Sequence, residues 1–326
     1  MLQLRGTLCE KSFIVALAAL AATASFAQSS VTLYGLANIG IQSTNSAKAN
    51  LAGGADGSDS RWGLRGSEDL GGGLAANFQF EAGLKPDVGT ADSTTAMFQR
   101  QSWAGLSSKS MGELRMGRQY TLGFDGTIGS MPSTYVDSAL ATGLGFGGMG
   151  SRNSDQIQYR SPSFGGFALH LSTQLAGDTT QAATAAAKSN EVRLAYANGP
   201  LVANLTTAST TNTNGTTSSP TSVNVSYDMR SVKLYGGYID TNRTSGTTVG
   251  KGYIAKAYVP MGANNFFVGF AKNDTNKADA YEIGNYYSLS KRTRLYAVYG
   301  NGSKDFTGSS GIANGKRYAL GMIHSF

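Results

Sequence analysis

The sequence predicts an all-β fold, a transmembrane antiparallel β-barrel of sixteen strands. The first observation is a period of two. Between residues 74 and 82, Phe78 and Phe80 alternate with Asn77, Gln79 and Glu81. Such alternation gives a strand one apolar and one polar face. The second observation is length, because these stretches reach about ten residues, as tilted membrane-crossing strands do, whereas ordinary strands have about five or six.

Sixteen segments of this kind begin near residues 31, 60, 74, 96, 112, 153, 166, 190, 201, 221, 231, 251, 264, 279, 292 and 316. Short turns alternate with long polar loops at 42–59, 84–95, 120–151, 177–189, 210–219, 241–250, 272–278 and 301–315. Seven short turns and eight long loops fit sixteen antiparallel strands with both termini on the short-turn side. A barrel of this size leaves an aqueous lumen, whereas one of about eight strands does not.

Residues 1–27 have the three parts of a secretory signal peptide. Arg5 and Lys11 give a basic start, an apolar run covers 13–24, and Ser-Phe-Ala at 25–27 is a small-x-small cleavage site. The run is too short for a stable membrane-spanning helix, although a single anchor is the alternative. We expect residues 1–27 to be removed and residues 28–326 to form one barrel domain. The only cysteine, Cys9, lies in the removed part, so the mature chain offers no disulfide and no cysteine metal ligand.

The chain is basic, with a formal net charge of +7, and stays basic without residues 1–27. A basic balance often indicates nucleic acid. An exported protein meets little of it, so we expect no nucleic-acid partner and favour an anionic solute or a lipid surface. Composition alone, with 43 glycines and 6 prolines, fits a secreted β-sandwich equally well.

Aromatic side chains near the expected strand ends favour the interfacial girdles of a membrane barrel. They are Trp62, Trp103, Tyr258, Tyr281, Tyr287 and Phe326. The sequence shows no evident run of aromatic residues that would form a sugar-binding slide.

Catalysis finds little support in the residue pattern. His170 and His324 are the only histidines, without a metal-ligand spacing or a cysteine partner. Neither lies in a motif that combines a nucleophile, a base and an orienting group. We therefore expect no enzyme activity, no cofactor and no metal.

Several motifs carry a family resemblance as a group. They are Ser-Val-Thr-Leu-Tyr-Gly at 30–35, Ser-Arg-Trp-Gly-Leu-Arg-Gly-Ser-Glu-Asp-Leu-Gly-Gly-Gly-Leu at 60–74, Arg-Gln-Ser-Trp-Ala-Gly-Leu at 100–106, Gly-Glu-Leu-Arg-Met-Gly-Arg-Gln-Tyr at 112–120, Arg-Asn-Ser at 152–154 and Tyr-Arg-Ser-Pro at 159–162. Together they resemble the Gram-negative trimeric general porins, particularly the beta-proteobacterial type, over residues 31–326.

The resemblance implies a homotrimer in the outer membrane, surrounded by lipid and lipopolysaccharide, that passes small ions and hydrophilic solutes passively. The terminal Phe326 looks like the signal that the barrel-assembly machinery reads. The loop at 84–95 is the expected trimer contact.

The resemblance also implies that the third long loop, 120–151, folds into the lumen. The loop has eight glycines and no Lys or Arg, and its only acids are Asp125 and Asp137. Facing it, Arg61, Arg100 and Arg152 occupy positions that match the family's constriction arginines. Arg65 follows Arg61 on the same strand face, and Arg118, at the start of the loop, is a further candidate whose direction strand parity leaves open.

Each arginine has a simpler alternative role, as a solvated lumen residue or as a partner of Glu81 or Glu68 that braces the barrel. Because several arginines face two acids, we expect weak anion preference. The alternative functions are a substrate-selective channel, a structural or adhesive barrel, or a secreted lectin.

Overall fold

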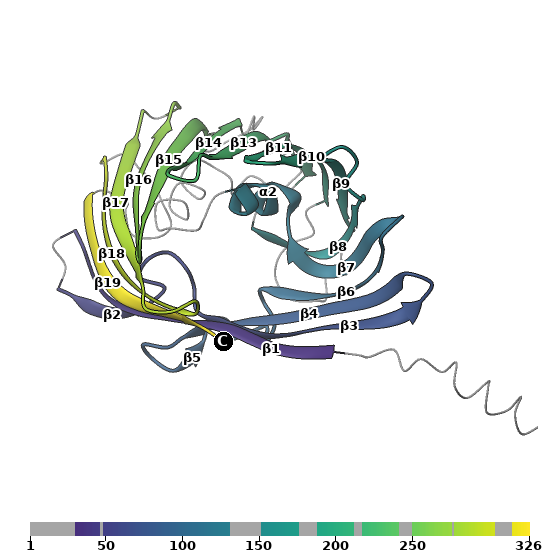
Figure 1. Ribbon diagram of the computed structural model, residues 1–326, viewed down its shortest axis with the longest axis horizontal. Coiled ribbons are helices and arrows are strands. Elements are labelled where there is room, and N and C mark those ends of the chain that lie inside the picture. The colour runs from purple at the N-terminus through teal and green to yellow at the C-terminus, as the bar shows by residue number, and fades with distance from the viewer. Residues whose placement is uncertain are drawn as a thin grey trace, which may run out of the picture.

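The computed structural model describes residues 30–45, 48–130, 151–175, 188–211, 217–240, 250–275, 277–303 and 315–326. The expected signal peptide, residues 1–27, and Asp137 lie outside these ranges. The described strands form one closed antiparallel ring, with a single helix inside it (Figure 1). The prediction of an all-β barrel is therefore confirmed.

Sixteen long strands build the ring in the described part of the chain. They are β1 (Ser30–Thr44), β3 (Arg61–Gly71), β4 (Leu74–Lys85), β6 (Gln101–Ser108), β7 (Gly112–Tyr120), β8 (Arg152–Arg160), β9 (Phe167–Gln174), β10 (Lys188–Asn198), β11 (Leu201–Thr211), β13 (Thr221–Asp228), β14 (Lys233–Asp240), β15 (Lys251–Met261), β16 (Asn264–Asn273), β17 (Asp279–Ser288), β18 (Thr293–Gly302) and β19 (Gly315–Ser325). Most begin within two residues of the predicted positions, but β6 begins at Gln101 rather than near 96.

Four short elements belong to the loops. They are β2 (Asn50–Gly53), β5 (Thr90–Ala91), β12 (Thr217–Ser218) and the helix α2 (Leu122–Ser130). No helix among the described residues combines the length and apolar character needed to cross a membrane.

The first and last strands close the barrel. β1 pairs with β19 from Leu36↔Ser325 to Thr44↔Arg317, and with β3 on its other side. The terminal residue continues the seam, because Phe326 and Gly35 exchange backbone hydrogen bonds of 3.0 and 3.1 Å. Closure leaves no strand edge with unpaired backbone groups, which a lipid environment requires.

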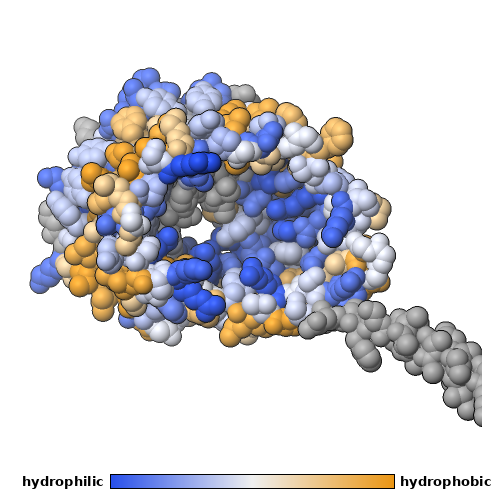
Figure 2. Space-filling model, viewed as in Figure 1, coloured by the Kyte–Doolittle hydropathy of each residue, from blue (hydrophilic) through white to orange (hydrophobic). Residues whose placement is uncertain are grey.

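The two faces of the wall have opposite chemistry. Apolar side chains point outward and stay exposed, as Leu33, Val223 and Leu320 do at 57%, 42% and 62%. Polar side chains such as Gln158 and Asn224 point inward and are buried. Figure 2 shows an opening through the ring with hydrophilic residues along it and apolar residues at the outer rim. A soluble protein has the reverse distribution, so the outer face is built for lipid.

The structure corrects two members of the predicted aromatic girdle. Trp62, Tyr281 and Tyr287 are exposed on the outer face. Trp103 and Tyr258 instead face the lumen and are buried, because Trp103 lies in register with Gln79, and Tyr258 with Phe267. Residues opposite each other in a ladder share one face.

A row of aromatic rings lines the inner face of five neighbouring strands, β14 to β18, which the sequence did not make evident. The rings are those of Tyr235, Tyr258, Phe267, Tyr286 and Tyr296, with successive centroids 5.5, 5.5, 5.2 and 6.5 Å apart. All are buried, in one apolar cluster with Ala52 and Ala55 of the first loop. The row therefore works as an internal core rather than as an open sugar-binding surface.

We predict that Gly35→Val destabilises the barrel at its seam. A Cβ at Gly35 would collide with the Phe326 ring, and overpacking of this kind costs roughly 1–3 kcal/mol. Thermal unfolding of the detergent-solubilised protein should show a lower midpoint than for Ala37→Val, a control on the same outward side of β1 at an exposed position. Equal midpoints for the two variants would contradict the prediction.

Candidate constriction site

Three of the predicted arginines lie together at the long-loop ends of their strands. Arg61 begins β3, Arg100 directly precedes β6 and Arg152 begins β8. The Glu81 carboxylate of β4 joins them, with Oε1 2.7 Å from Arg100 Nε and Oε2 3.9 Å from Arg61 Nε. Arg152 lies within electrostatic range of Arg100 and Glu81. Glu81 therefore pairs with Arg61 and Arg100, which was one of the alternatives left open by the sequence. The three arginines also cluster, so the two arrangements occur together.

Arg100 is the inner member of this group. Its side chain is 8% exposed, and its guanidinium also lies 3.3 Å from Asp59 Oδ2. Burial alone would lower the pKa of Arg100, but Tyr120 and the carboxylates of Glu81 and Asp59 hold that pKa above its ordinary value. The site therefore keeps this positive charge at every accessible pH.

Arg152 links the wall to the start of the third long loop. Its guanidinium lies 4.5 Å from the centre of the Tyr120 ring and 6.0 Å from that of Phe124. It also donates a 3.0 Å hydrogen bond to the Tyr120 hydroxyl. A planar guanidinium suits this combination of stacking and hydrogen bonding, so the first residues of the loop are fixed against the arginine.

Arg65 lies further along β3, towards the short turns. It is exposed and stacks on Tyr34 at 5.2 Å. With Arg115 and Arg160 it lines a cavity of about 850 Å³ at the short-turn end of the lumen. It is therefore a wall residue of the wider vestibule, four residues along β3 from Arg61 of the arginine cluster.

Arg118 has a different place from the one proposed on sequence. It lies opposite Ser102, which in turn lies opposite the outward-facing Phe80. It lies within a break in the register with β8, between Gly117 and Gln119. Its guanidinium donates hydrogen bonds to the Gln99 carbonyl and the Ser154 hydroxyl, so it ties loop ends together on the outer side of the strand.

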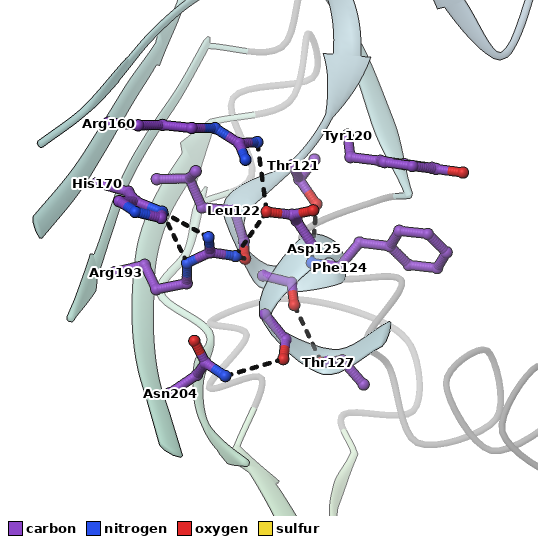
Figure 3. Close-up of polar contacts among 12 residues, drawn as sticks. Tyr120, Thr121, Leu122, Phe124, Asp125, Thr127, Arg160, His170, Arg193 and Asn204 are labelled. Carbon is purple, nitrogen blue, oxygen red and sulfur yellow. Dashed lines mark hydrogen bonds and ion pairs between the residues drawn. The ribbon is translucent and has the colours of Figure 1, made fainter. Parts of the chain in front are cut away.

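The helix α2 lies inside the ring, against β10, β11 and β13 (Figures 1 and 3). An inward start of the third loop, as expected, is thus seen in residues 121–130. Asp125 does not face the cluster of Arg61, Arg100 and Arg152. Its Oδ2 lies 2.8 Å from Arg193 NH1 and 3.3 Å from Arg160 NH2 (Figure 3).

The N-terminus of α2 is held by side chains from the wall. The Leu122 amide donates a 2.5 Å hydrogen bond to Glu191 Oε2, and Thr121 Oγ1 caps the helix by accepting from the Phe124 amide at 3.1 Å. A carboxylate at this end also matches the helix dipole. Asn204 donates to the Gly126 carbonyl at 3.2 Å, so contacts from two strands of the wall fix the capped helix in place.

The charge of Asp125 is favoured where it lies. Burial alone would raise the pKa of its carboxyl, but the guanidiniums of Arg160 and Arg193 outweigh burial and hold that pKa below its ordinary value of 3.8. The ion pairs are therefore present at neutral pH and are lost only as the pH falls through the lowered value.

Sequence reasoning anticipated Glu81 but missed the loop acid that meets an arginine of the cluster. Asp59 belongs to the first loop, and it contacts Arg100 from there. It also missed Arg160 and Arg193 as the partners of Asp125. Alternation along β8 and β10 could have identified both arginines as lumen-facing, but no sequence signal gives the path of a loop. Among the described residues, no group of three or more acidic, histidine or cysteine side chains gathers as a metal site would require.

Comparisons with known proteins agree with this geometry. The family model described as Gram-negative porin matches residues 15–307. The chain belongs to the Gram-negative porin family. An outer membrane porin protein of Bordetella pertussis is 31% identical, over 91% of this chain and 95% of that protein. Outer membrane porin protein 32 of Delftia acidovorans is 33% identical, over 88% of each chain.

Solved structures show the same barrel. The anion-selective porin from Comamonas acidovorans has a TM-score of 0.72 at 26% identity, covering 92% of this chain and 100% of its own. The trimer form of OmpT from Vibrio cholerae has a TM-score of 0.71 at 16% identity, covering 91% and 99%. The second likeness concerns the fold alone.

This porin is therefore an outer-membrane protein that forms a water-filled channel for the passive diffusion of small hydrophilic solutes. Its relatives are channels rather than enzymes. Both conclusions agree with the sequence prediction, and the polar inner face described above is the surface along which such solutes pass.

We predict that Asp125→Asn loosens α2 inside the lumen. The substitution removes two charge-assisted contacts, and each such hydrogen bond contributes roughly 1.5–3 kcal/mol. Single-channel recordings at pH 7 should show larger open-channel current noise than the wild type. Asp228→Asn is the matched control, because Asp228 is a lumen-facing acid of β13 that does not contact α2. Unchanged noise in Asp125→Asn would contradict this role.

The same contact gives a pH dependence with a definite sign. Because the folded-state pKa of Asp125 is lowered, its stabilisation of the loop is complete above about pH 4 and disappears at lower pH. Wild-type current noise should therefore rise below about pH 4, and recordings of Asp125→Asn at the same pH values should lack that step. A rise of equal size in both proteins would assign the step to other groups.

Proposed function

We propose that this porin is a weakly anion-selective diffusion channel whose constriction is formed by Arg61, Arg100 and Arg152. The observation that supports it most is charge balance, since three guanidiniums face the two carboxylates Glu81 and Asp59. Charged rings at a narrow point set ion preference, and arginine stays charged at any accessible pH. The similar porin of Comamonas acidovorans is described as anion-selective, which supports the same sign here.

Arg65 extends this basic wall into the vestibule. The Asp125 role is proposed as a docking contact for the loop rather than as an acid of the opening, and Asp137 stays a candidate acid of the loop. The aromatic row that a sugar-selective channel would need is buried, so general diffusion is the better-supported mode.

We further propose that the mature protein is a single barrel domain, residues 28–326, exported by the signal peptide 1–27 and assembled as a homotrimer. Residues Leu84–Lys85 pair with Thr90–Ala91 in a small hairpin, and β5 lies outside the ring in Figure 1, where the hairpin can reach a neighbour. The apolar outer face suits lipid, and lipopolysaccharide is the expected neighbour at the long-loop end. Phe326, exposed beside the seam, is the proposed signal for the assembly machinery.

Zero-current potentials across a planar lipid bilayer with a KCl gradient test the selectivity. We expect a reversal potential of the sign that chloride permeation gives, and a clearly cation-selective potential would contradict the proposal. In the same recordings, conductance steps that close in threes are the expected signature of the trimer.

We predict that Arg61→Gln and Arg152→Gln each lower the chloride-to-potassium permeability ratio. A unit charge about 6 Å from a permeating ion in water changes the permeability of chloride and of potassium about threefold each, in opposite directions, so the ratio should fall about tenfold. Arg292→Gln removes an equal charge from an exposed short turn and should leave the ratio near the wild-type value. Equal ratios in all three variants would show that the cluster does not set selectivity.

A further inference from the structure

The strand beside β1 is interrupted on its way through the barrel. β2 pairs with β1 up to Gly53↔Ile39, and β3 begins with Arg61↔Leu36. Seven residues, 54–60, therefore occupy a gap that spans only two residues of β1. We call residues 54–60 the inner bulge. Gly54 and Gly57 have φ values of +75° and +99°, which glycine adopts at little cost, and they turn the chain away from the wall.

The inner bulge points into the lumen, where its carboxylate Asp56 is completely buried. Asp56 accepts hydrogen bonds from Asn38 Nδ2 at 2.5 Å, from the Ser58 amide at 2.9 Å and from the Tyr286 hydroxyl at 3.0 Å. Asn38 lies on β1, and Tyr286 lies on β17, on the inner face of the wall. Because a buried carboxylate is costly without such partners, these bonds lock the bulge in one position.

A further strand holds the same segment directly, and another holds it through Asn38. Arg317 of β19 donates a 2.7 Å hydrogen bond to the Ala55 carbonyl. The Tyr296 hydroxyl of β18 donates to Asn38 Oδ1 at 3.0 Å, and the Asn38 backbone amide donates to Ser60 Oγ at 2.9 Å. Contacts with β1, β17, β18 and β19 together make the bulge part of the packed interior.

The locked segment leads directly into the constriction. Asp59, three residues after Asp56, places Oδ2 3.3 Å from Arg100 NH1, and its backbone carbonyl accepts a 3.1 Å hydrogen bond from Arg61 NH1. The Asp59 side chain is 67% exposed, whereas that of Glu81 is 6% exposed. Of the two acids that meet the arginine cluster, Asp59 is the one that a passing ion can approach.

We propose that Asp59 is a specificity-determining residue of the channel and that Asp56 is the positioning residue that holds it against Arg100. Asp59 lowers the local positive potential and thereby limits anion preference. Asp56 acts only through the path of the inner bulge. The proposal rests on the proposed role of the arginine cluster for its location, but its test compares each variant with the wild type, whichever sign the wild-type selectivity has.

The first test is Asp59→Asn, which removes the charge and keeps the size of the side chain. Reversal potentials in a KCl gradient should show an increase of about tenfold in the chloride-to-potassium permeability ratio, because one unit charge at about 6 Å in water changes the permeability of each ion about threefold and in opposite directions. Asp59→Glu keeps the charge and should stay near the wild-type ratio. An unchanged ratio in Asp59→Asn overturns the specificity role, even if the arginine variants confirm the proposed function.

The second test separates positioning from charge. Asp56→Ala removes all three hydrogen bonds and should raise the ratio as Asp59→Asn does, together with the open-channel noise. In the double variant, Asp59→Asn should add nothing to the ratio, because an Asp59 released from Arg100 no longer contributes. Full additivity, or an unchanged ratio in Asp56→Ala, overturns the positioning role.

Asp56→Asn is the conservative control. Burial raises the pKa of the Asp56 carboxyl, so an uncharged amide fits this position. Its oxygen can accept from Asn38 and Ser58, while its amino group donates to the Tyr286 hydroxyl. The variant should retain the wild-type ratio and noise. If Asp56→Ala does not assemble, Tyr286→Phe removes one hydrogen bond and should shift the ratio in the same direction by less, and no shift there overturns the positioning role.

Discussion

Closure of the backbone hydrogen bonds is the constraint on which the other features of this porin depend. A strand in hydrocarbon has no water to form hydrogen bonds with its amides and carbonyls. The backbone of β1 therefore pairs with that of β19, and Phe326 pairs with Gly35. Once the ring is closed, alternation along each strand assigns every side chain to lipid or to lumen. Charges can then gather only inside, and the cluster of Arg61, Arg100 and Arg152 is a consequence of that assignment.

Strand positions could be predicted because period two and turn residues are local signals. Side-chain direction near strand ends could not, since it depends on register with a neighbour. Trp103 faces inward because it lies opposite Gln79, and Arg118 faces outward because it lies opposite Ser102. The start of β6 is predicted near 96 but lies at Gln101, because the loop after the small hairpin of Leu84–Lys85 with Thr90–Ala91 continues to residue 100.

Within the site, the arginines and their partner Glu81 could be predicted, but the contacts of the loop acids could not. Arg61, Arg100 and Arg152 belong to strand ends that a family resemblance fixes, whereas Asp125 and Asp59 belong to loops whose path depends on tertiary contacts. Asp125 docks α2 on Arg160 and Arg193, and Asp59 reaches Arg100 from the inner bulge. A loop acid therefore takes its role from the wall residue that it meets, which the sequence alone does not specify.

Because of the inner bulge, the free cross-section of the lumen is not determined by the circumference of the barrel alone. The circumference of the barrel depends on its strands and their shear, while the free cross-section also depends on what packs against the inner wall. Residues 54–60 and the aromatic row of β14 to β18 form an apolar and hydrogen-bonded lining on one side of the lumen. Substitutions in this short loop segment can consequently change the width of the pore and the charge of the ions that it prefers. The arrangement of the strands in the membrane stays the same.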